Sequence, residues 1–124
     1  MALLAISLGV LFQGPAAQAQ PRTVLALYKS AEGDTAQDNG ISNLLESTLN
    51  DLGLVVRYHD LTTQGLPRAD RLQDVLGIVT WFATDEVAKP VAYCDWLVQH
   101  IEAGRRVVIF GSMGAFVDAA TKQP

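Results

Sequence analysis

The sequence predicts an α/β fold in which helices cover both faces of a parallel β-sheet, a three-layer arrangement. Two apolar runs, residues 77–83 and 106–110, have the length and composition of buried strands. A helical pattern between them stops at Gly104, and the second run leads into a glycine-rich turn at residues 111–114. A strand, a crossover helix and a second strand make the βαβ unit of a parallel sheet.

The first half of the chain predicts a second βαβ unit. Residues 22–29 are almost continuously apolar, which is typical of a strand that is covered on both faces. Leucine and isoleucine then recur at helical spacing through residues 41–52, where Asp38 or Asn39 can serve as the N-cap and a glycine follows. The apolar residues 54–58 predict the second strand.

The remaining elements follow from proline and from hydrophobic spacing. Residues 69–76 are expected to form a short helix, and residues 115–120 are expected to start a final one. The main helix is expected to begin near Lys89, because Pro90 is tolerated only in the first turn. Its buried face is expected to consist of Val91, Cys94, Val98 and Ile101.

Right-handed crossovers favour the strand order 2-1-3-4, which is flavodoxin-like. The chain direction then reverses between the first and third strands, and open α/β sheets bind ligands at such a switch point. Residues 30–39 and 81–86 would line this crevice, with residues 111–114 beside them. Because flavodoxin-like sheets usually have a fifth strand, we expect the chain to be a fragment or the first domain of a longer protein.

The composition excludes several classes of function. A net charge of -4 provides no basic surface for nucleic acid, so no nucleic-acid partner is expected. The single cysteine excludes an internal disulfide and a site with several thiolate ligands. His59 and His100 lack the short spacing of a zinc motif. No metal ion and no organic cofactor is therefore predicted.

Residues 1–19 are set apart from the predicted domain, which spans residues 20–124. An apolar run at residues 1–12 precedes small residues at 17–19, the pattern of a signal peptide, and the mature protein would then be periplasmic or secreted. Residues 8–15 also resemble a viral protease site that is engineered for tag removal. If they are such a remnant, the protein would be cytoplasmic. Both interpretations stay open.

Three segments resemble the class I glutamine amidotransferase-like superfamily. Residues 24–28 open the domain, residues 52–56 enter the second strand, and residues 101–108 enter the fourth. The similarity covers about residues 22–119 and is nearest to the non-catalytic versions of this domain in bacterial envelope proteins, including those joined to polysaccharide deacetylase modules. The resemblance implies the α/β fold, and it implies other domains or proteins of an envelope assembly as partners.

Ser112 is the one candidate for catalysis. Catalytic members of the superfamily have Gly-x-Cys-x-Gly after a strand, and here Ser112 stands at the cysteine, Gly114 at the second glycine and Phe110 at the first. The histidine and acidic partners of that family come from further along the chain than this sequence extends. A serine without a base is a poor nucleophile, so the resemblance argues against amidotransferase activity. The alternative to a nucleophile is an N-cap of the final helix.

Nine residues are candidates for ligand binding because they fall in the loops at the predicted switch point. They are Ser30, Asp34, Thr35, Trp81, Thr84, Asp85, Gly111, Ser112 and Gly114. The two glycines would either bind an anion or allow close packing. A flavin phosphate is not expected there, because Glu32 and Asp34 would repel it. Trp81 either belongs to the core or stacks on a sugar, which makes carbohydrate a candidate ligand.

These observations predict a non-catalytic structural or binding domain of an exported envelope protein, a module of a polysaccharide-processing protein. One alternative is a hydrolase or amidotransferase-like enzyme that uses Ser112, with His59 or another chain supplying the base. The other alternative is a module that binds a small ligand in the crevice between the first and third strands. The oligomeric state does not follow from the sequence.

Overall fold

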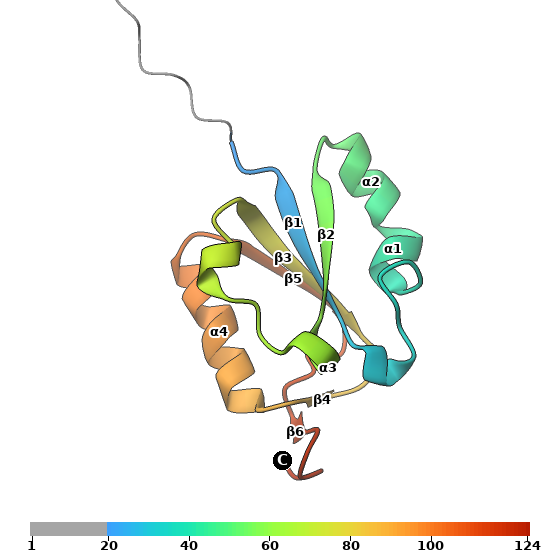
Figure 1. The fold of residues 1–124 in the computed structure, drawn as a ribbon, viewed down its shortest axis with the longest axis vertical. Helices are drawn as coiled ribbons and strands as arrows, with labels where there is room; N and C mark the ends of the chain where they lie inside the picture. Colours follow the sequence, from blue (N-terminus) through green and yellow to red (C-terminus); the bar gives the residue numbers. More distant parts are fainter. Residues whose placement is uncertain (1–19) are drawn as a thin grey trace, which may run out of the picture.

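A computed structural model describes residues 20–124, so the predicted signal peptide or cleavage-site remnant lies outside the described residues. Strands and helices alternate along the chain (Figure 1). The strands are β1 (Thr23–Tyr28), β2 (Val55–Asp60), β3 (Val75–Phe82), β4 (Glu86–Val87), β5 (Arg106–Gly111) and β6 (Val117–Asp118). The helices are α1 (Gly40–Leu44), α2 (Glu46–Asp51), α3 (Leu61–Gln64) and α4 (Pro90–Glu102), with 3₁₀ turns η1 (Ser30–Glu32) and η2 (Ala69–Arg71).

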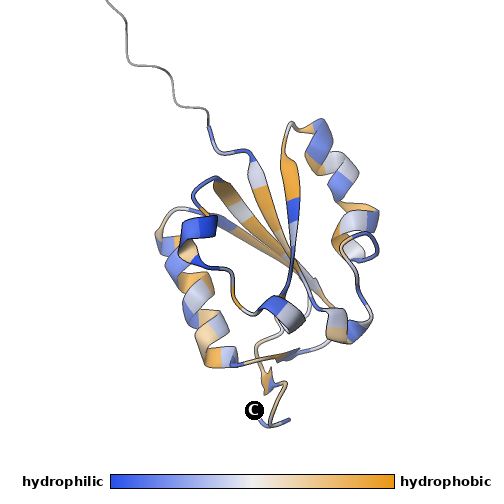
Figure 2. Ribbon diagram, viewed as in Figure 1, coloured by the Kyte–Doolittle hydropathy of each residue, from blue (hydrophilic) through white to orange (hydrophobic). Residues whose placement is uncertain are grey.

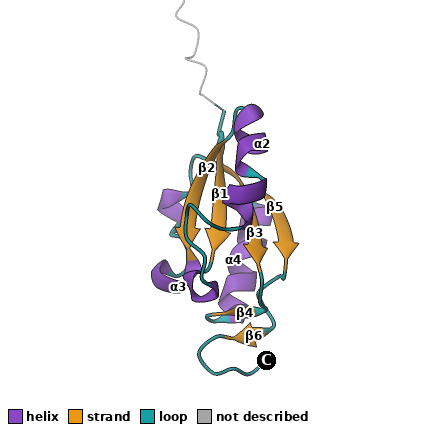
Figure 3. Ribbon diagram, turned by 90° about the vertical axis from the view of Figure 1, so that its right-hand side faces the viewer, coloured by secondary structure: helices purple, strands orange, loops and turns teal. Residues whose placement is uncertain are grey.

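The main sheet has four parallel strands in the order β2-β1-β3-β5. This arrangement confirms the predicted parallel α/β sheet. The predicted order was 2-1-3-4. The strand at the last position is β5, the fifth strand of the chain, because the unpredicted two-residue strand β4 comes between β3 and β5. Strands β4 and β6 form a separate parallel pair beyond the carboxyl ends of the main strands (Figure 3).

Two hydrophobic clusters fill the two faces of the sheet, since successive side chains of a strand alternate between faces. In the central strand β1, Leu25 and Leu27 pack with α4, whereas Val24 and Ala26 pack with α1 and α2. Hydrophobic residues accordingly follow the strands, and the most hydrophilic residues lie on the outer helices and loops (Figure 2).

The first helical segment begins where the sequence predicts, but it is interrupted. Asn39 is the N-cap: its side-chain oxygen accepts hydrogen bonds from the N–H groups of Ile41 and Ser42 at 2.9 and 3.0 Å. The Ser42 hydroxyl in turn accepts from the Asn39 N–H at 3.0 Å, which completes a capping box. A break at Leu45 divides the predicted continuous helix into α1 and α2.

Helix α4 starts at Pro90 as predicted, but the predicted buried face is wrong. The buried side chains are Tyr93, Trp96, Leu97 and His100. Val98 and Ile101 are 50% and 54% exposed, Val91 is exposed as well, and Cys94 is only half-buried. The physical reason is area: Tyr93 and Trp96 each remove more apolar surface from water than a valine does, so the helix turns them toward the sheet.

Two further sequence predictions are corrected by the structure, and one helix was not predicted. Residues 115–120 form no helix, because β6 pairs with β4 and the Ala119 N–H donates to the Val87 carbonyl at 2.9 Å. The predicted helix at 69–76 is reduced to the 3₁₀ turn η2, and β3 starts at Val75. The chain also forms α3, which was not predicted, with Asp60 as its N-cap. No helix within residues 20–124 is long and apolar enough to cross a membrane.

Replacing Tyr93 with phenylalanine is expected to leave the free energy of unfolding unchanged or raise it by up to about 1 kcal/mol. The hydroxyl groups of Tyr93 and Thr80 are buried and have no hydrogen-bond partner in the described part of the chain. Burial raises the pKa of the Tyr93 phenol, so the group is neutral and its removal uncovers no charge. Urea unfolding at pH 7 measures the effect. A loss of more than about 1 kcal/mol would show that the hydroxyl is satisfied.

Candidate functional site

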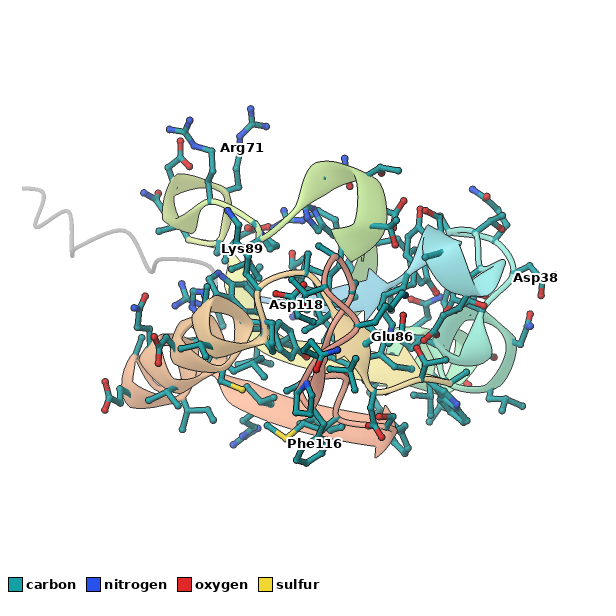
Figure 4. All side chains as sticks on the ribbon, turned by 90° about the horizontal axis from the view of Figure 1, so that it is seen from below. Asp38, Arg71, Glu86, Lys89, Phe116 and Asp118 are labelled. Atoms are coloured by element: carbon teal, nitrogen blue, oxygen red, sulfur yellow. The ribbon has the colours of Figure 1, made fainter. Side chains whose placement is uncertain are left out.

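A cavity of about 500 Å³ opens at the carboxyl edge of the main sheet, beside the ends of β1 and β3. Figure 4 views the molecule from this edge, with Glu86 and Asp118 near the centre of the view and Asp38 and Arg71 toward its periphery. The position is the switch point where the sequence predicts a ligand site. Five alanines, Leu61 and Val87 form the apolar wall, and the polar lining consists of Lys29, Glu32, Thr62, Thr84 and Glu86.

Lys29 forms the centre of a buried polar cluster in this cavity. Its side chain is 5% exposed, and its Nζ lies 2.6 Å from Glu32 Oε1. The same ammonium group donates to the Thr84 hydroxyl at 3.1 Å, to the Thr84 carbonyl at 3.0 Å and to the Glu86 carbonyl at 2.7 Å. It also lies 4.5 Å from the centre of the Phe82 ring. An ammonium group has three N–H donors, so these contacts occupy all of them.

Glu32 links η1 to the loop after β3. Its carboxylate accepts hydrogen bonds from the N–H groups of Ala83 and Thr84 at 3.0 and 2.9 Å, and from the Thr84 hydroxyl at 2.5 Å. Burial by itself would raise the pKa of Glu32, but the hydrogen bonds from Lys29, Thr84 and Ala83 outweigh it and hold the pKa below its usual value. The carboxylate is therefore ionised at neutral pH and fixed in place.

Asp60, at the end of β2, is likewise a carboxylate that links separate segments of the chain through hydrogen bonds. Its Oδ1 accepts from the N–H groups of Ser30 and Thr62, both at 3.0 Å, and its Oδ2 accepts from the Thr63 hydroxyl at 2.7 Å. Burial would raise the pKa of Asp60, but these hydrogen bonds lower it to about 2. The side chain joins β2, α3 and η1. His59 and Asp60 are the last two residues of β2.

Acid is expected to remove the stability that Asp60 provides. The pKa of Asp60 is lower in the folded state than the ordinary aspartate value of 3.8, so the contribution is complete above about pH 4 and is lost as the pH falls toward 2. Asp60→Asn should therefore unfold at lower urea than the wild type at pH 7, and the gap should narrow between pH 4 and pH 2. Asp70→Asn, at an exposed aspartate, is the matched control. A gap that stays constant with pH would contradict the assignment.

Ser112 contacts a carboxylate and no histidine. Its hydroxyl hydrogen-bonds to Asp85 Oδ1, and the Gly114 N–H donates to the Ser112 oxygen at 3.2 Å. The Ser112 N–H donates to the Phe82 carbonyl at 2.8 Å. The N-cap interpretation is wrong, because no helix follows. Ser112 instead holds the loop after β5 against the loop after β3.

The two histidines of the chain lie elsewhere. His59 Nε2 is 2.7 Å from the Gly65 carbonyl oxygen, on the β2 side of the sheet. His100 is buried on α4, with its ring edge against Trp96 and its Nδ1 3.2 Å from an Arg105 nitrogen. Burial, with a smaller effect of the Arg105 charge, lowers the pKa of His100, which disfavours the charged imidazolium at this helix end. Neither imidazole is placed to act on Ser112.

Gly111 and Gly114 serve close packing around Phe82. Both have positive φ, 68° and 74°, which side chains of L-residues rarely adopt. A Cβ on Gly111 would lie 2.4 Å from the Phe82 carbonyl oxygen, and one on Gly114 would lie 2.6 Å from the Phe82 ring. The anion-binding interpretation required a helix N-terminus at this turn, and no helix follows it. The geometry supports the packing interpretation.

The other candidate residues are dispersed around the edge. Trp81 stacks on Phe110 with ring centres 5.0 Å apart on the face that packs with α1 and α2, so it is part of that cluster. Thr35 closes its own loop, since its hydroxyl accepts from the Asp38 N–H at 3.0 Å. Burial and the nearby Glu32 raise the pKa of Asp34. The Ser30 N–H donates to Asp60, and Asp85 is hydrogen-bonded to Ser112. Of the nine candidate residues, Thr84 alone lines the cavity.

Sequence reasoning missed three polar residues that line the cavity or close it: Lys29, Asp60 and Thr62. Glu86 lies in the predicted lining range 81–86 but was not among the nine candidates. The sequence positions of Lys29 and Asp60 could have revealed them. Each stands at the carboxyl end of a predicted strand, and in a parallel sheet these ends lie at the same edge. Within residues 20–124, no three histidine, cysteine, aspartate or glutamate side chains gather as metal ligands would. Comparison with family models, curated proteins and solved structures gave no match to this chain.

Proposed function

We propose that this chain is a non-catalytic structural or binding domain of flavodoxin-like topology. The observation that carries the proposal is the pairing of polar groups at the carboxyl edge. Lys29 and Glu32 bind each other and the β3 loop, Asp60 binds three groups of the chain, and Ser112 binds Asp85. A serine nucleophile needs an activating base within hydrogen-bond reach, and Ser112 has a carboxylate there and no imidazole. Lys29, Glu32 and Asp60 are held by hydrogen bonds and an ion pair to groups of the fold.

The proposed setting is the bacterial envelope, in a module of a polysaccharide-processing protein. Two sequence features support it: the signal-peptide pattern before residue 20 and the resemblance of residues 22–119 to non-catalytic glutamine amidotransferase-like domains. The partners would be other domains or proteins of that assembly, and the mature domain would be periplasmic or secreted. Mass spectrometry of the protein isolated from its source tests this setting. A processed N-terminus near Gln20 is expected, and an intact Met1 in the cytoplasm would contradict it.

A fluorophosphonate probe tests the absence of catalysis. Ser112 is the hydroxyl that a serine hydrolase of this topology would use, and its contact with Asp85 supplies no imidazole base. The wild-type chain is expected to take up no label under conditions that label an authentic serine hydrolase. Labelling that Ser112→Ala abolishes would contradict the proposal and favour the enzyme alternative.

Binding of a small ligand is the second candidate function, and the cavity of about 500 Å³ favours it. This volume lies in the range of small-molecule sites, and the alanine-rich wall leaves the space open. Amide NMR spectra recorded during titration with glucose and N-acetylglucosamine test the candidate. Shifts confined to Ala88, Ala119 and their neighbours, which Ala119→Trp abolishes, would support it. Unchanged spectra at millimolar sugar would contradict carbohydrate binding at this cavity.

A further inference from the structure

The geometry points to a second copy of this chain as the partner of the free edge of β5. Two copies would pair their β5 strands antiparallel and join two four-stranded sheets into one. The inference goes beyond the proposed function and does not depend on it. It rests on the exposure of β5, on the apolar flank of α4 and on the placement of charge at the two ends of the strand.

Strand β5 is an edge strand with unusually apolar residues. It pairs with β3 on one side, and no other strand of the described chain pairs with its other side. Val108 and Ile109, on opposite faces, are 48% and 39% exposed. Proteins usually protect such edges with charges, prolines or bulges, and no charged residue stands between Arg106 and Gly111. The opposite edge, β2, is different, since it contains Arg57, His59 and Asp60.

One exposed apolar residue of α4 lies on the flank toward the same edge. Trp96 on one flank of the helix donates from its Nε1 to the Pro67 carbonyl at 3.1 Å, toward the β2 side. Ile101 lies on the other flank, about 140° around the helix from Trp96, whereas Val98 points away from the sheet. Phe116, also exposed, lies on the β5 side in the view from the carboxyl edge (Figure 4). We call these residues the β5 surface: Ile101, Val108, Ile109 and Phe116.

The charges at the ends of β5 match a second copy. A two-fold axis perpendicular to the sheet relates the two copies, so their β5 strands are antiparallel. The face of the sheet covered by α4 then lies on the same side in both copies, and paired residues project from the same face. The register centred on Ile109 then places Arg106 opposite Ser112 of the partner. Asp85 is exposed and contacts Ser112. Each Arg106 therefore approaches the Asp85 carboxylate of the other copy, and the symmetry makes this contact twice.

Sedimentation velocity of the full chain over a range of micromolar concentrations tests the inference. The wild type is expected to sediment as a monomer–dimer equilibrium. Val108→Lys should weaken the dimer at least about tenfold, because it places a charged side chain opposite Phe110 of the other copy on the apolar pairing edge. Val55→Lys is the matched control, since Val55 is 60% exposed on the opposite edge strand and should leave the dimer unchanged. Circular dichroism melts confirm that both variants are folded, and Ile109→Lys replaces Val108→Lys if the latter is unfolded.

A charge-reversal experiment distinguishes the specific Arg106–Asp85 contact from nonspecific hydrophobic association. Arg106→Glu should weaken the dimer, and Arg106→Glu combined with Asp85→Lys should restore it. A wild-type chain that stays monomeric at every concentration would overturn the inference. A dimer that Val55→Lys weakens as much as Val108→Lys would also overturn it. So would a dimer that survives Val108→Lys but is lost when residues 1–12 are removed, because the contact would then belong to that apolar segment.

Discussion

Replacing Lys29 with methionine is expected to lower the free energy of unfolding by about 3–5 kcal/mol. The change leaves the buried Glu32 carboxylate without its ion-pair partner, in a place where its side chain is 7% exposed. It also removes the donor for the Thr84 and Glu86 carbonyls. Methionine keeps the length and most of the apolar volume of lysine, so the loss reports the charge and its hydrogen bonds. Urea unfolding at pH 7 measures it.

A surface ion pair of the same type provides the control for this substitution. Lys122 pairs with Glu86 at 2.5 Å, but its side chain is 63% exposed. Lys122→Met is therefore expected to cost no more than about 1 kcal/mol, because water and salt screen an exposed pair. Equal losses for Lys29→Met and Lys122→Met would mean that burial adds nothing to the Lys29 contacts, contrary to the geometry.

Replacing Gly111 with alanine is expected to destabilise the domain by about 2–5 kcal/mol, the sum of backbone strain and overpacking. The new Cβ would meet the Phe82 carbonyl oxygen, a backbone atom that also accepts the Ser112 N–H. Because that atom cannot rotate away, the turn that joins β5 to the Ser112 loop must move. Differential scanning calorimetry measures the lowered unfolding temperature.

Gly33 separates the two contributions to the Gly111 effect. It has a φ of 89°, and a Cβ there would have no heavy atom within 4 Å. Gly33→Ala therefore reports backbone strain alone, about 1–2 kcal/mol. If Gly111→Ala cost no more than Gly33→Ala, the close approach of Gly111 to Phe82 would not exist in solution.

The sheet was predictable from the sequence because its strands are continuous apolar runs. Residues 22–29 and 77–83 are covered on both faces, and right-handed crossovers restrict the order of such strands to few possibilities. The orientation of α4 was not predictable in the same way. Its hydrophobic residues lie all around the helix, so spacing alone does not distinguish the Val98 side from the Trp96 side, and the larger aromatic area decides.

The position of the site was predictable from the sequence, but the contacts among its side chains were not. The carboxyl edge follows from the strand order, whereas the Lys29 and Glu32 contacts to Thr84 join residues more than 50 positions apart. The end of the chain was predicted wrongly for a similar reason. Residues 115–120 have helical composition, but their backbone groups pair with β4 and with the Asp85 carbonyl, and such long-range hydrogen bonds leave no periodic signal in a sequence.

The central claim is that the polar groups at the carboxyl edge hold the fold together. A double-mutant cycle on Lys29→Met and Glu32→Gln, measured by urea unfolding at pH 7, tests it most directly. If the two groups stabilise each other, the double variant should be more stable than the sum of the single losses predicts, by about 1–3 kcal/mol. Losses that add to within about 0.5 kcal/mol would contradict the claim, because they would show that Lys29 and Glu32 act independently.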